Sequence, residues 1–401
     1  MENKNNIWLY NNIDLKEGEE LIGVNWSRKR NIGFSNIHSI SSYLAMFAPS
    51  LPNYFINKYS VVNDTVMDNF SGRGTTALVS REMSRNFVGT DLNPYALALS
   101  KFKVGTCKKK KLLKKIYELE IEFKNSQFIY ETKINDYEEM QIYYSNKTLS
   151  QLIFLREKIG KKWRSLNFID NAILVYALGL MHGPSKKDGT STYFSISMPN
   201  TISMSPNYVK NYAKKNNLIC PNSDVFELLI NRINYKFDDL LEKKYNGKIY
   251  EFDSTKKNKK IKNGTVSLVI TSPPYLNIVN YKTSNWLKLW LMGYDRKNLN
   301  KDIMLSDNLK FDEYVIFIKN YLNAIYKKIK VSGKICLIVG DVNHKKLIED
   351  VWKIIEKDVS YNFVEIYYDN NYLQNHKVTN MLNNKKGKST IIEKVLVLEK
   401  K

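Results

Sequence analysis

The sequence contains little cysteine and histidine, which excludes two kinds of site. Only three cysteines occur among 401 residues, far apart and without a CxxC pair. Neither a disulfide framework nor a zinc site is therefore expected, and a reducing compartment is favoured. The four histidines show no metal-ligand spacing either. We expect no metal ion in this protein.

Long apolar segments are also missing. No run of about 18 uninterrupted apolar residues occurs in the chain. The amino terminus, MENKNNIWLY, lacks the apolar core of a signal peptide. These absences predict a soluble, cytoplasmic protein without a membrane partner.

Acidic residues are outnumbered, with 40 Asp and Glu against 62 Lys and Arg, which gives a net charge of +22. Such an excess speeds the encounter with a polyanion and makes binding depend on salt. It indicates a nucleic-acid partner without proving it, because a lysine-rich proteome would give the same total. A chain of 401 residues is too long for one small domain, so more than one domain is expected.

The most informative motif is TSPPY, residues 271–275, which directly follows the apolar run 266–270. A buried strand that ends in this way presents three useful groups at its carboxyl edge. Ser272 can hydrogen-bond a nucleobase, and the Pro273 carbonyl stays free to accept from an exocyclic amino group. Tyr275 offers a stacking face. The alternative interpretation is a strand followed by a tight proline turn.

A second motif runs from a short strand through glycines into a helix, VMDNFSGRGTTAL at 66–78. Gly72 and Gly74 allow a ligand close to the backbone, and the free N–H groups at the helix start suit an anion. Residues 86–91 predict a second strand that ends at Asp91, where a parallel sheet places a carboxylate for ribose hydroxyls. The spacing fits an adenosyl ligand, although no GxGxxG fingerprint is present.

Together, DNFSGRGTT (68–76) and TSPPY resemble the cofactor and catalytic motifs of the amino-group DNA methyltransferases, DPFxGSGTT and (D/N/S)PPY. Residues 38–49 are similar to the segment that this family places over the methionine part of the cofactor, and 249–254 to the strand end near its adenine. The chain departs from the pattern at Asn69, where Pro is usual, and at Arg73, where Ser is usual. It also has Glu251-Phe252 where a Gly precedes the Asp.

The resemblance implies S-adenosylmethionine as the methyl donor and assigns site residues position by position. The implied cofactor-binding residues are Tyr43, Asp68, Phe70, Gly72, Gly74, Thr75, Asp91 and Asp253. The implied catalytic residues are Ser272, Pro273, Pro274 and Tyr275. Tyr275 would stack on a base flipped out of the duplex.

The expected fold is α/β, a doubly wound (Rossmann-like) methyltransferase sheet with a largely helical inserted domain. The alternation of strands and helices stops between about 105 and 247, where 111–124, 149–159 and 170–181 predict helices. Three parts follow: a cofactor-binding half (1–104), a helical insert for target recognition (105–247) and a catalytic half (248–401). Polar irregular stretches at 183–192 and 197–208 have groups suited to phosphates and base edges.

The expected activity is methylation of an exocyclic amine in DNA, in a restriction-modification or other host-defence setting with a cognate endonuclease as a further partner. Ser272 favours cytosine N4, with adenine N6 as the alternative. The same motifs also leave open a catalytically silent DNA-binding subunit of this fold and an RNA or protein-glutamine methyltransferase. C5-cytosine chemistry is disfavoured, because the only adjacent pair, Cys220-Pro221, has the reverse order of the required Pro-Cys.

Overall fold

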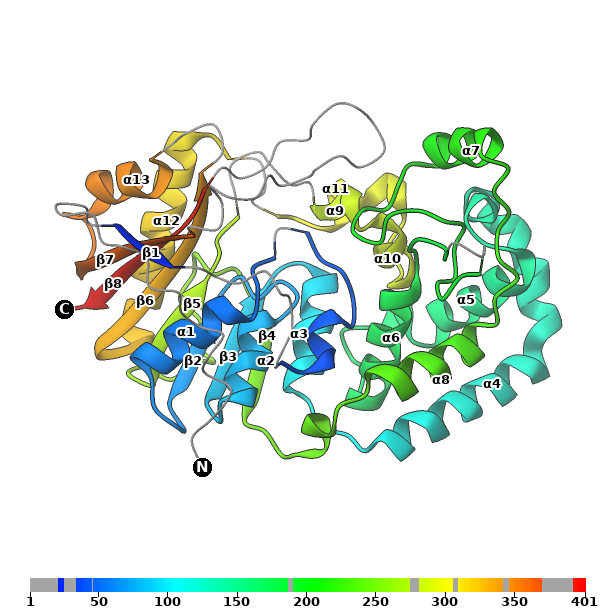
Figure 1. Cartoon of the computed structure of the whole chain (residues 1–401), viewed down its shortest axis with the longest axis horizontal. Helices are drawn as coiled ribbons and strands as arrows, with labels where there is room; N and C mark the ends of the chain where they lie inside the picture. The colour runs from blue at the N-terminus through cyan, green and yellow to red at the C-terminus, as the bar shows by residue number, and fades with distance from the viewer. Residues whose placement is uncertain are drawn as a thin grey trace.

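The computed structural model describes residues 21–24, 34–44, 46–186, 190–274, 281–305, 309–341, 346–369 and 392–401, to which every structural statement below refers. One sheet of eight strands, in the order β1-β7-β8-β6-β5-β2-β3-β4, lies in one half of the molecule, on the left in Figure 1. The strands are β1 (Leu21–Val24), β2 (Thr65–Asp68), β3 (Asn86–Asp91), β4 (Gly247–Glu251), β5 (Val266–Thr271), β6 (Ile329–Asp341), β7 (Tyr361–Asp369) and β8 (Ile392–Lys400). Only β8 runs antiparallel to its neighbours.

Helices cover both faces of this sheet, as expected for a doubly wound fold. Alternate residues of the central strands point to opposite faces. Val66 and Leu268 pack with α1 (Ser50–Tyr59) and α2 (Thr75–Glu82), whereas Val269 packs with α12 (Phe311–Ile325) and α13 (Leu347–Ile355). Each residue of β5 is buried, which explains its unbroken apolar run. The predicted fold class is confirmed.

The stretch between β3 and β4 is mostly helical, as predicted. The predicted helices at 111–124, 149–159 and 170–181 lie in α4, α5 and α6. The helices from α3 onward are α3 (Pro94–Val104), α4 (Lys109–Thr132), α5 (Asn146–Lys158), α6 (Phe168–Leu180), α7 (Pro206–Lys215), α8 (Val225–Lys236), α9 (Tyr281–Ser284), α10 (Trp286–Leu291) and α11 (Leu299–Asp302). Shorter 3-10 turns are η2 (Asn36–Ser39), η3 (Lys133–Ile142), η4 (Gly160–Lys162), η5 (Asp239–Glu242), η6 (Arg296–Asn298) and η7 (Tyr326–Lys328).

The helical insert shares its apolar core with elements on both sides of it in the chain. One continuous cluster of buried side chains includes Phe102 of α3, Phe154 and Tyr176 of the insert, and Trp286 and Trp290 of α10. Packing therefore joins α10 to the insert, although the sequence assigned it to the catalytic half. The three-part division at 104 and 247 stays a proposal, and removal of 105–247 would expose the apolar faces of α3 and α10.

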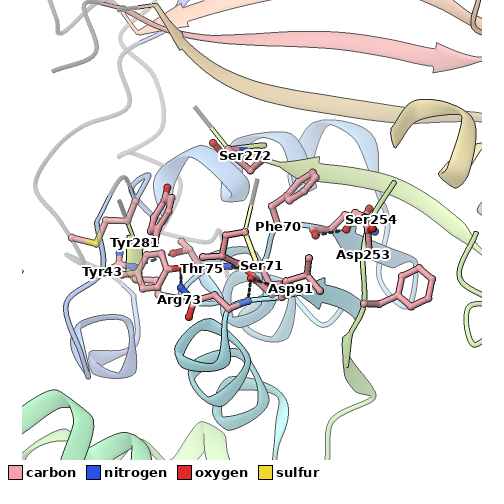
Figure 2. A pocket seen from close by; sticks show the side chains of 18 of the residues that line it. Tyr43, Phe70, Ser71, Arg73, Thr75, Asp91, Asp253, Ser254, Ser272 and Tyr281 are labelled. Carbon is pink, nitrogen blue, oxygen red and sulfur yellow. Dashed lines mark hydrogen bonds between the residues drawn. The ribbon is translucent and has the colours of Figure 1, made fainter. Parts of the chain in front are cut away.

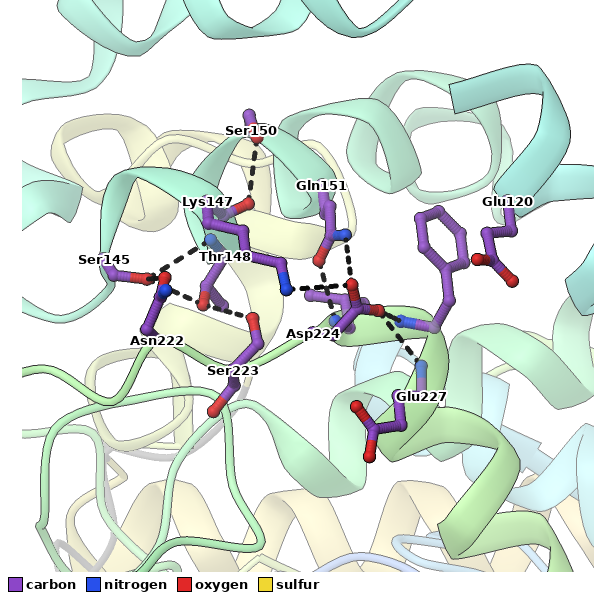
Figure 3. A network of polar contacts seen from close by, with 12 residues as sticks. Glu120, Ser145, Lys147, Thr148, Ser150, Gln151, Asn222, Ser223, Asp224 and Glu227 are labelled. Carbon is purple, nitrogen blue, oxygen red and sulfur yellow. Dashed lines mark hydrogen bonds and ion pairs between the residues drawn. The ribbon is translucent and has the colours of Figure 1, made fainter. Parts of the chain in front are cut away.

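Asp224 fastens α8 to α5 inside the insert (Figure 3). Its Oδ1 accepts from the backbone N–H groups of Phe226 and Glu227, and so caps the start of α8. Its Oδ2 accepts from Gln151 Nε2 at 3.1 Å and pairs with Lys147 Nζ at 3.2 Å. Burial alone would raise the pKa of Asp224, but these hydrogen bonds and the nearby ammonium lower it.

Asp224→Ala should lower the melting temperature at neutral pH, since loss of an N-cap costs about 0.5–2 kcal/mol. The folded pKa is lowered, so the stabilisation is present above the unfolded pKa of about 4 and is lost as pH falls through the folded pKa. Thermal melts at pH 7.5 and pH 3 test this. The exposed Asp136 supplies the control Asp136→Ala. A difference from wild type that is as large at pH 3 as at pH 7.5 would contradict the assignment.

Candidate active site

A pocket opens at the carboxyl ends of β2, β3, β4 and β5, where the two sequence motifs meet (Figure 2). It encloses about 920 Å³ of empty space, including its open mouth. Ligands of open α/β sheets bind at such strand ends. The lining residues are Tyr43, Met46, Phe47, Asn69, Phe70, Ser71, Gly72, Arg73, Thr75, Asp91, Leu92, Asn93, Phe252, Asp253, Ser254, Ser272, Pro274, Tyr281, Leu305 and Phe317.

The glycine turn between β2 and α2 forms one wall. Gly72 and Gly74 both have positive φ, +49° and +72°. Gly72 lines the pocket, and a Cβ there would lie 3.5 Å from the Tyr43 ring. Gly74 stands just before α2, and its Cβ would lie 2.9 Å from Ser100 Oγ and 3.0 Å from Ser100 Cα. Gly74, predicted to bind cofactor, therefore serves the packing of α2 against α3 and is not among the lining residues.

Asp91 holds this turn in place from the end of β3. Its Oδ2 accepts from Gly72 N at 2.8 Å, and its Oδ1 accepts from Leu92 N and Asn93 N, both at 2.8 Å. Burial raises the pKa of Asp91 to about 6, against the opposing effect of these three N–H groups. Each oxygen has more than one acceptor site, so the carboxylate that shapes the turn can also accept from a ligand in the pocket.

Asp68 has a different position from the one predicted for it. Its side chain is 1% exposed and does not line the pocket. Asp68 Oδ1 accepts from Thr271 Oγ1 at 2.6 Å and from Phe70 N at 3.1 Å. Burial raises its pKa to about 6. A buried carboxylate needs hydrogen-bond donors. Those of Asp68 come from the end of β5 and the start of the glycine turn, so Asp68 joins these two segments from behind the pocket wall.

Asn69, where the family pattern has Pro, connects four elements at the base of the pocket. Its side chain donates from Nδ2 to Thr90 Oγ1 at 3.3 Å and accepts at Oδ1 from Tyr321 of α12 at 3.0 Å. Its carbonyl accepts from Ser254 Oγ at 2.7 Å. A proline could make none of the side-chain contacts. Asn69 therefore makes side-chain hydrogen bonds that the family pattern, with Pro at this position, does not predict.

The two ends of the pocket differ in chemistry. Figure 2 shows Tyr43, Tyr281, Arg73 and Thr75 at one end, Asp253 and Ser254 at the other, and Asp91 between them. Arg73 is 8% exposed and donates from Nε to Thr75 Oγ1 at 3.1 Å. Asp253 lies at the rim, where burial would raise its pKa but hydrogen bonds from Thr255 and Lys256 lower it. One end thus has a buried cation and the other has an ionised acid.

The catalytic motif reaches the same pocket from the end of β5. Ser272 and Pro274 line it, whereas Pro273 is buried and not among the lining residues. Ser272 donates its hydroxyl proton to the Ile338 carbonyl of β6 at 3.1 Å. Because that proton is engaged there, the lone pairs of Ser272 Oγ can accept from a donor in the pocket. Tyr275 lies outside the described residues.

Several lining residues had no signal in the motifs. Phe317 comes from α12, and its ring lies 5.7 Å from that of Phe70. Met46, Phe47, Leu92 and Leu305 add further apolar surface. Met46 and Phe47 belong to the segment that resembles the family's methionine cover. Phe317, Leu92 and Leu305 lie outside the motifs, and only the folded structure shows that they line the pocket.

In the described ranges no helix is long and apolar enough to cross a membrane, and no group of three or more His, Cys, Asp or Glu residues could hold a metal ion.

The chain is similar to known DNA methyltransferases. Residues 1–102 match the sequence pattern of a family described as DNA methylase. The Type II methyltransferase M.MvaI of Kocuria varians is 21% identical over 348 residues, which cover 80% of this chain and 72% of that protein. M.MjaII of Methanocaldococcus jannaschii is 23% identical, and the match covers 84% of this chain and 79% of that protein. A solved structure, TrmN of Thermus thermophilus, matches with a TM-score of 0.36 at 8% identity, covering 91% of this chain and 52% of that chain.

The sheet order and the strand-end pocket define a doubly wound α/β protein with a candidate active site at the carboxyl ends of its strands. The family match at the amino terminus contains the glycine turn and Asp91, and the two relatives extend the similarity over most of the chain. The family match and these relatives support the predicted resemblance to the amino-group DNA methyltransferases.

Gly74→Ala should destabilise the protein more than Gly264→Ala. Both residues have positive φ, which costs a substituted L-residue about 1–2 kcal/mol. Only at Gly74 does the new Cβ also meet packed atoms, for which overpacking adds about 1–3 kcal/mol. Gly264 has nothing within 4 Å. Denaturant unfolding of both variants measures the difference, and equal losses would show that α2 does not need the close approach to α3.

Proposed function

We propose that this protein transfers a methyl group from S-adenosylmethionine to the exocyclic amine of a base in double-stranded DNA, with cytosine N4 as the favoured target. The observation that carries the proposal is the position of Ser272 in the pocket of Asp91 and Gly72. A hydrogen-bond acceptor at the catalytic strand end thus faces the same space as the glycine turn. The N4 preference comes from serine as the first residue of the motif.

The pocket residues fit the proposed cofactor in their chemistry. Asp91 would accept from the ribose hydroxyls, Asp253 and Phe252 would lie at the adenine, and Arg73 and Thr75 would meet the methionine carboxylate. Tyr43 is 8% exposed and would cover that end. The activated sulfonium methyl is the chemistry that the cofactor supplies when bound. The cation of Arg73 suits a carboxylate in a partly dry site.

The catalytic residues have little covalent work in this mechanism. Ser272 Oγ would accept one N–H of the target amine and the Pro273 carbonyl the other, which orients the nitrogen lone pair toward the methyl carbon. With the cofactor bound, the amine held by these two groups would form the new C–N bond as the S–C bond breaks, and would then release its proton to water. Tyr275, by its place in the motif, would stack on the flipped base.

The insert, 105–247, is proposed as the part that recognises the DNA sequence. The irregular stretches 183–186, 190–192 and 197–205 supply hydroxyl and amide groups suited to phosphates and base edges. The relatives named Type II methyltransferases support a restriction-modification setting, in which a cognate endonuclease would cut the same unmethylated site. The net charge of +22 suits a DNA partner.

Asp91 should make the affinity for S-adenosylhomocysteine depend on pH. Burial raises its pKa to about 6, so the carboxylate loses its charge as pH falls from 8 to 5 and becomes a weaker acceptor for ribose hydroxyls. The dissociation constant should rise over this range. Asp91→Asn should bind about tenfold to hundredfold more weakly at pH 8, the range for a lost charged hydrogen bond, with a flatter pH profile. Calorimetry measures both.

Glu82 provides the matched control, because burial raises its pKa to about 7 and it lies outside the pocket lining. Glu82→Gln should keep the pH dependence of wild type. Since an amide at position 91 would place an NH2 group near Gly72 N, melting temperatures are measured in parallel. An Asp91→Asn protein that keeps the wild-type profile would remove Asp91 from the cofactor site.

Ser272→Ala should lower the methylation rate without weakening S-adenosylhomocysteine binding. An unpaired amine N–H costs about 1–3 kcal/mol, which is roughly fivefold to 150-fold in rate. Ser267, on the same strand but bonded to Asp64 Oδ1 at 2.6 Å, provides the control Ser267→Ala. Single-turnover kinetics on unmethylated DNA compare the methylation rates of Ser272→Ala and Ser267→Ala. Equal rates for wild type and Ser272→Ala would exclude Ser272 from the reaction.

The identity of the modified base distinguishes the candidate activities. DNA from a host that expresses the protein, digested to nucleosides and analysed by mass spectrometry, should contain N4-methyldeoxycytidine. N6-methyldeoxyadenosine instead would establish adenine as the target. Neither base, in a protein that does not bind S-adenosylhomocysteine, would indicate a silent DNA-binding subunit. Sequencing of the same DNA for modified bases gives the recognition site.

A further inference from the structure

Lys288 is a buried lysine at the junction of the sheet and the helical insert. It lies on α10, which contacts α3 on one side and α5 on the other (Figure 1). Its side chain is 2% exposed, and burial lowers its pKa to about 7. It makes no ion pair with a carboxylate of the described ranges. A buried ammonium of this kind destabilises the fold by more than an apolar side chain of equal length would.

The ammonium binds two segments that are far apart in the chain. Lys288 Nζ donates to Ser42 O at 3.2 Å, to Ser42 Oγ at 3.1 Å and to Asn200 O at 3.4 Å. It also lies 5.0 Å from the centre of the Tyr95 ring. Two of the three acceptors are backbone carbonyls. Lys288 therefore positions the main chain at Ser42 and at Asn200.

From Ser42 the contacts continue into the cofactor pocket. The next residue, Tyr43, lines the pocket, and its hydroxyl accepts from Asn93 Nδ2 at 3.1 Å. Asn93 N in turn donates to Asp91. Tyr95 donates its hydroxyl to Ser42 O at 2.6 Å, and its ring lies 5.5 Å from that of Tyr43. A ligand that orders Tyr43 and Asp91 would thus restrict Ser42 as well.

From Asn200 the contacts continue into the irregular stretch 197–205 of the insert. His182 bridges this stretch, with Nδ1 at 2.8 Å from Pro199 O and Nε2 at 3.0 Å from Ser203 Oγ. Ser203 N donates to Ser284 O of α9 at 2.8 Å. None of the residues that line the pocket belongs to 197–205. Any effect of a pocket ligand on this stretch must therefore pass through intervening contacts. Ser42 Oγ donates to Asn200 O, and Lys288 Nζ binds both residues of this contact.

We propose that Lys288 is a positioning residue that couples the cofactor pocket to the stretch 197–205, so that a bound cofactor orders this part of the insert for DNA. The inference rests on the proposed function and adds to it a route between the two sites. Coupling of this kind needs a contiguous physical connection, which the contacts of Ser42, Lys288 and Asn200 provide. By linkage, DNA bound at 197–205 would strengthen cofactor binding by the same factor.

Hydrogen exchange tests the coupling without knowledge of the DNA site. In wild type, saturating S-adenosylhomocysteine should slow amide exchange in peptides that span 197–205 by about fivefold or more, the lower end of ordinary coupling between sites. Lys288→Met should bind S-adenosylhomocysteine within about threefold of wild type, since Lys288 does not line the pocket, and should lose the slowing. A purely structural role would lower the melting temperature and leave the ligand effect on 197–205 intact, which would overturn the proposal.

Two controls and a second variant make the result specific. Lys282→Met removes a lysine of α9 that donates to Ile303 O, and Asn200→Ala keeps the carbonyl that Lys288 binds. Both should retain the slowing. If Lys288→Met does not fold, Ser42→Ala decides: it removes Oγ, which contacts both Lys288 and Asn200 O, and should reduce the slowing. An unchanged effect in Ser42→Ala would then refute the coupling.

Wild type that fails to bind S-adenosylhomocysteine would overturn the proposed function itself, whereas wild type that binds it without slowing at 197–205 would overturn only the coupling.

Discussion

The site depends on one buried contact between two strands that are distant in the chain. Thr271 at the end of β5 donates to Asp68 at the end of β2, and its oxygen accepts from Phe70 N. The two residues are 203 positions apart, yet their strands pair in parallel. Because Asp68 and Thr271 are buried, separation would remove a hydrogen bond from both a carboxylate and a hydroxyl in a dry interior. This contact sets the distance between the glycine turn and the catalytic strand end, on which an in-line transfer depends.

Three acidic residues near the pocket have different roles because their surroundings differ. Asp68 has no access to the pocket and bonds two elements of the wall. Asp91 organises the glycine turn through three backbone N–H groups and also lines the pocket. Asp253 lies at the rim, where burial would raise its pKa but hydrogen bonds from Thr255 and Lys256 lower it. The sequence shows an acid at each of these three positions. Only the folded chain shows that one is structural, one holds the turn and one lies at the rim.

The insert and the sheet are packed as one body in the described part of the chain. A common apolar core runs from α3 through the insert to α10, and the buried Lys288 binds main chain on both sides. A recognition region attached in this way differs from one on a flexible linker, because movement on one side changes contacts on the other. The physical consequence is that cofactor affinity and DNA affinity need not be independent properties of this protein.

The sequence by itself determined the strands β2, β3 and β5, the sheet class and the two motifs. Unbroken apolar runs predict buried parallel strands, as at β5, and a GxG turn before a helix has few alternatives because both glycines need positive φ. The division of roles among residues within the motifs could not be predicted this way. The sequence assigned Asp68 and Gly74 to cofactor binding. Their neighbours Thr271 and Ser100, which come from other elements, give them structural roles instead. The tertiary structure alone brought Phe317 and Tyr281 to the pocket and Lys288 to Ser42 and Asn200, since contacts between distant segments follow from packing and leave no local pattern in the chain.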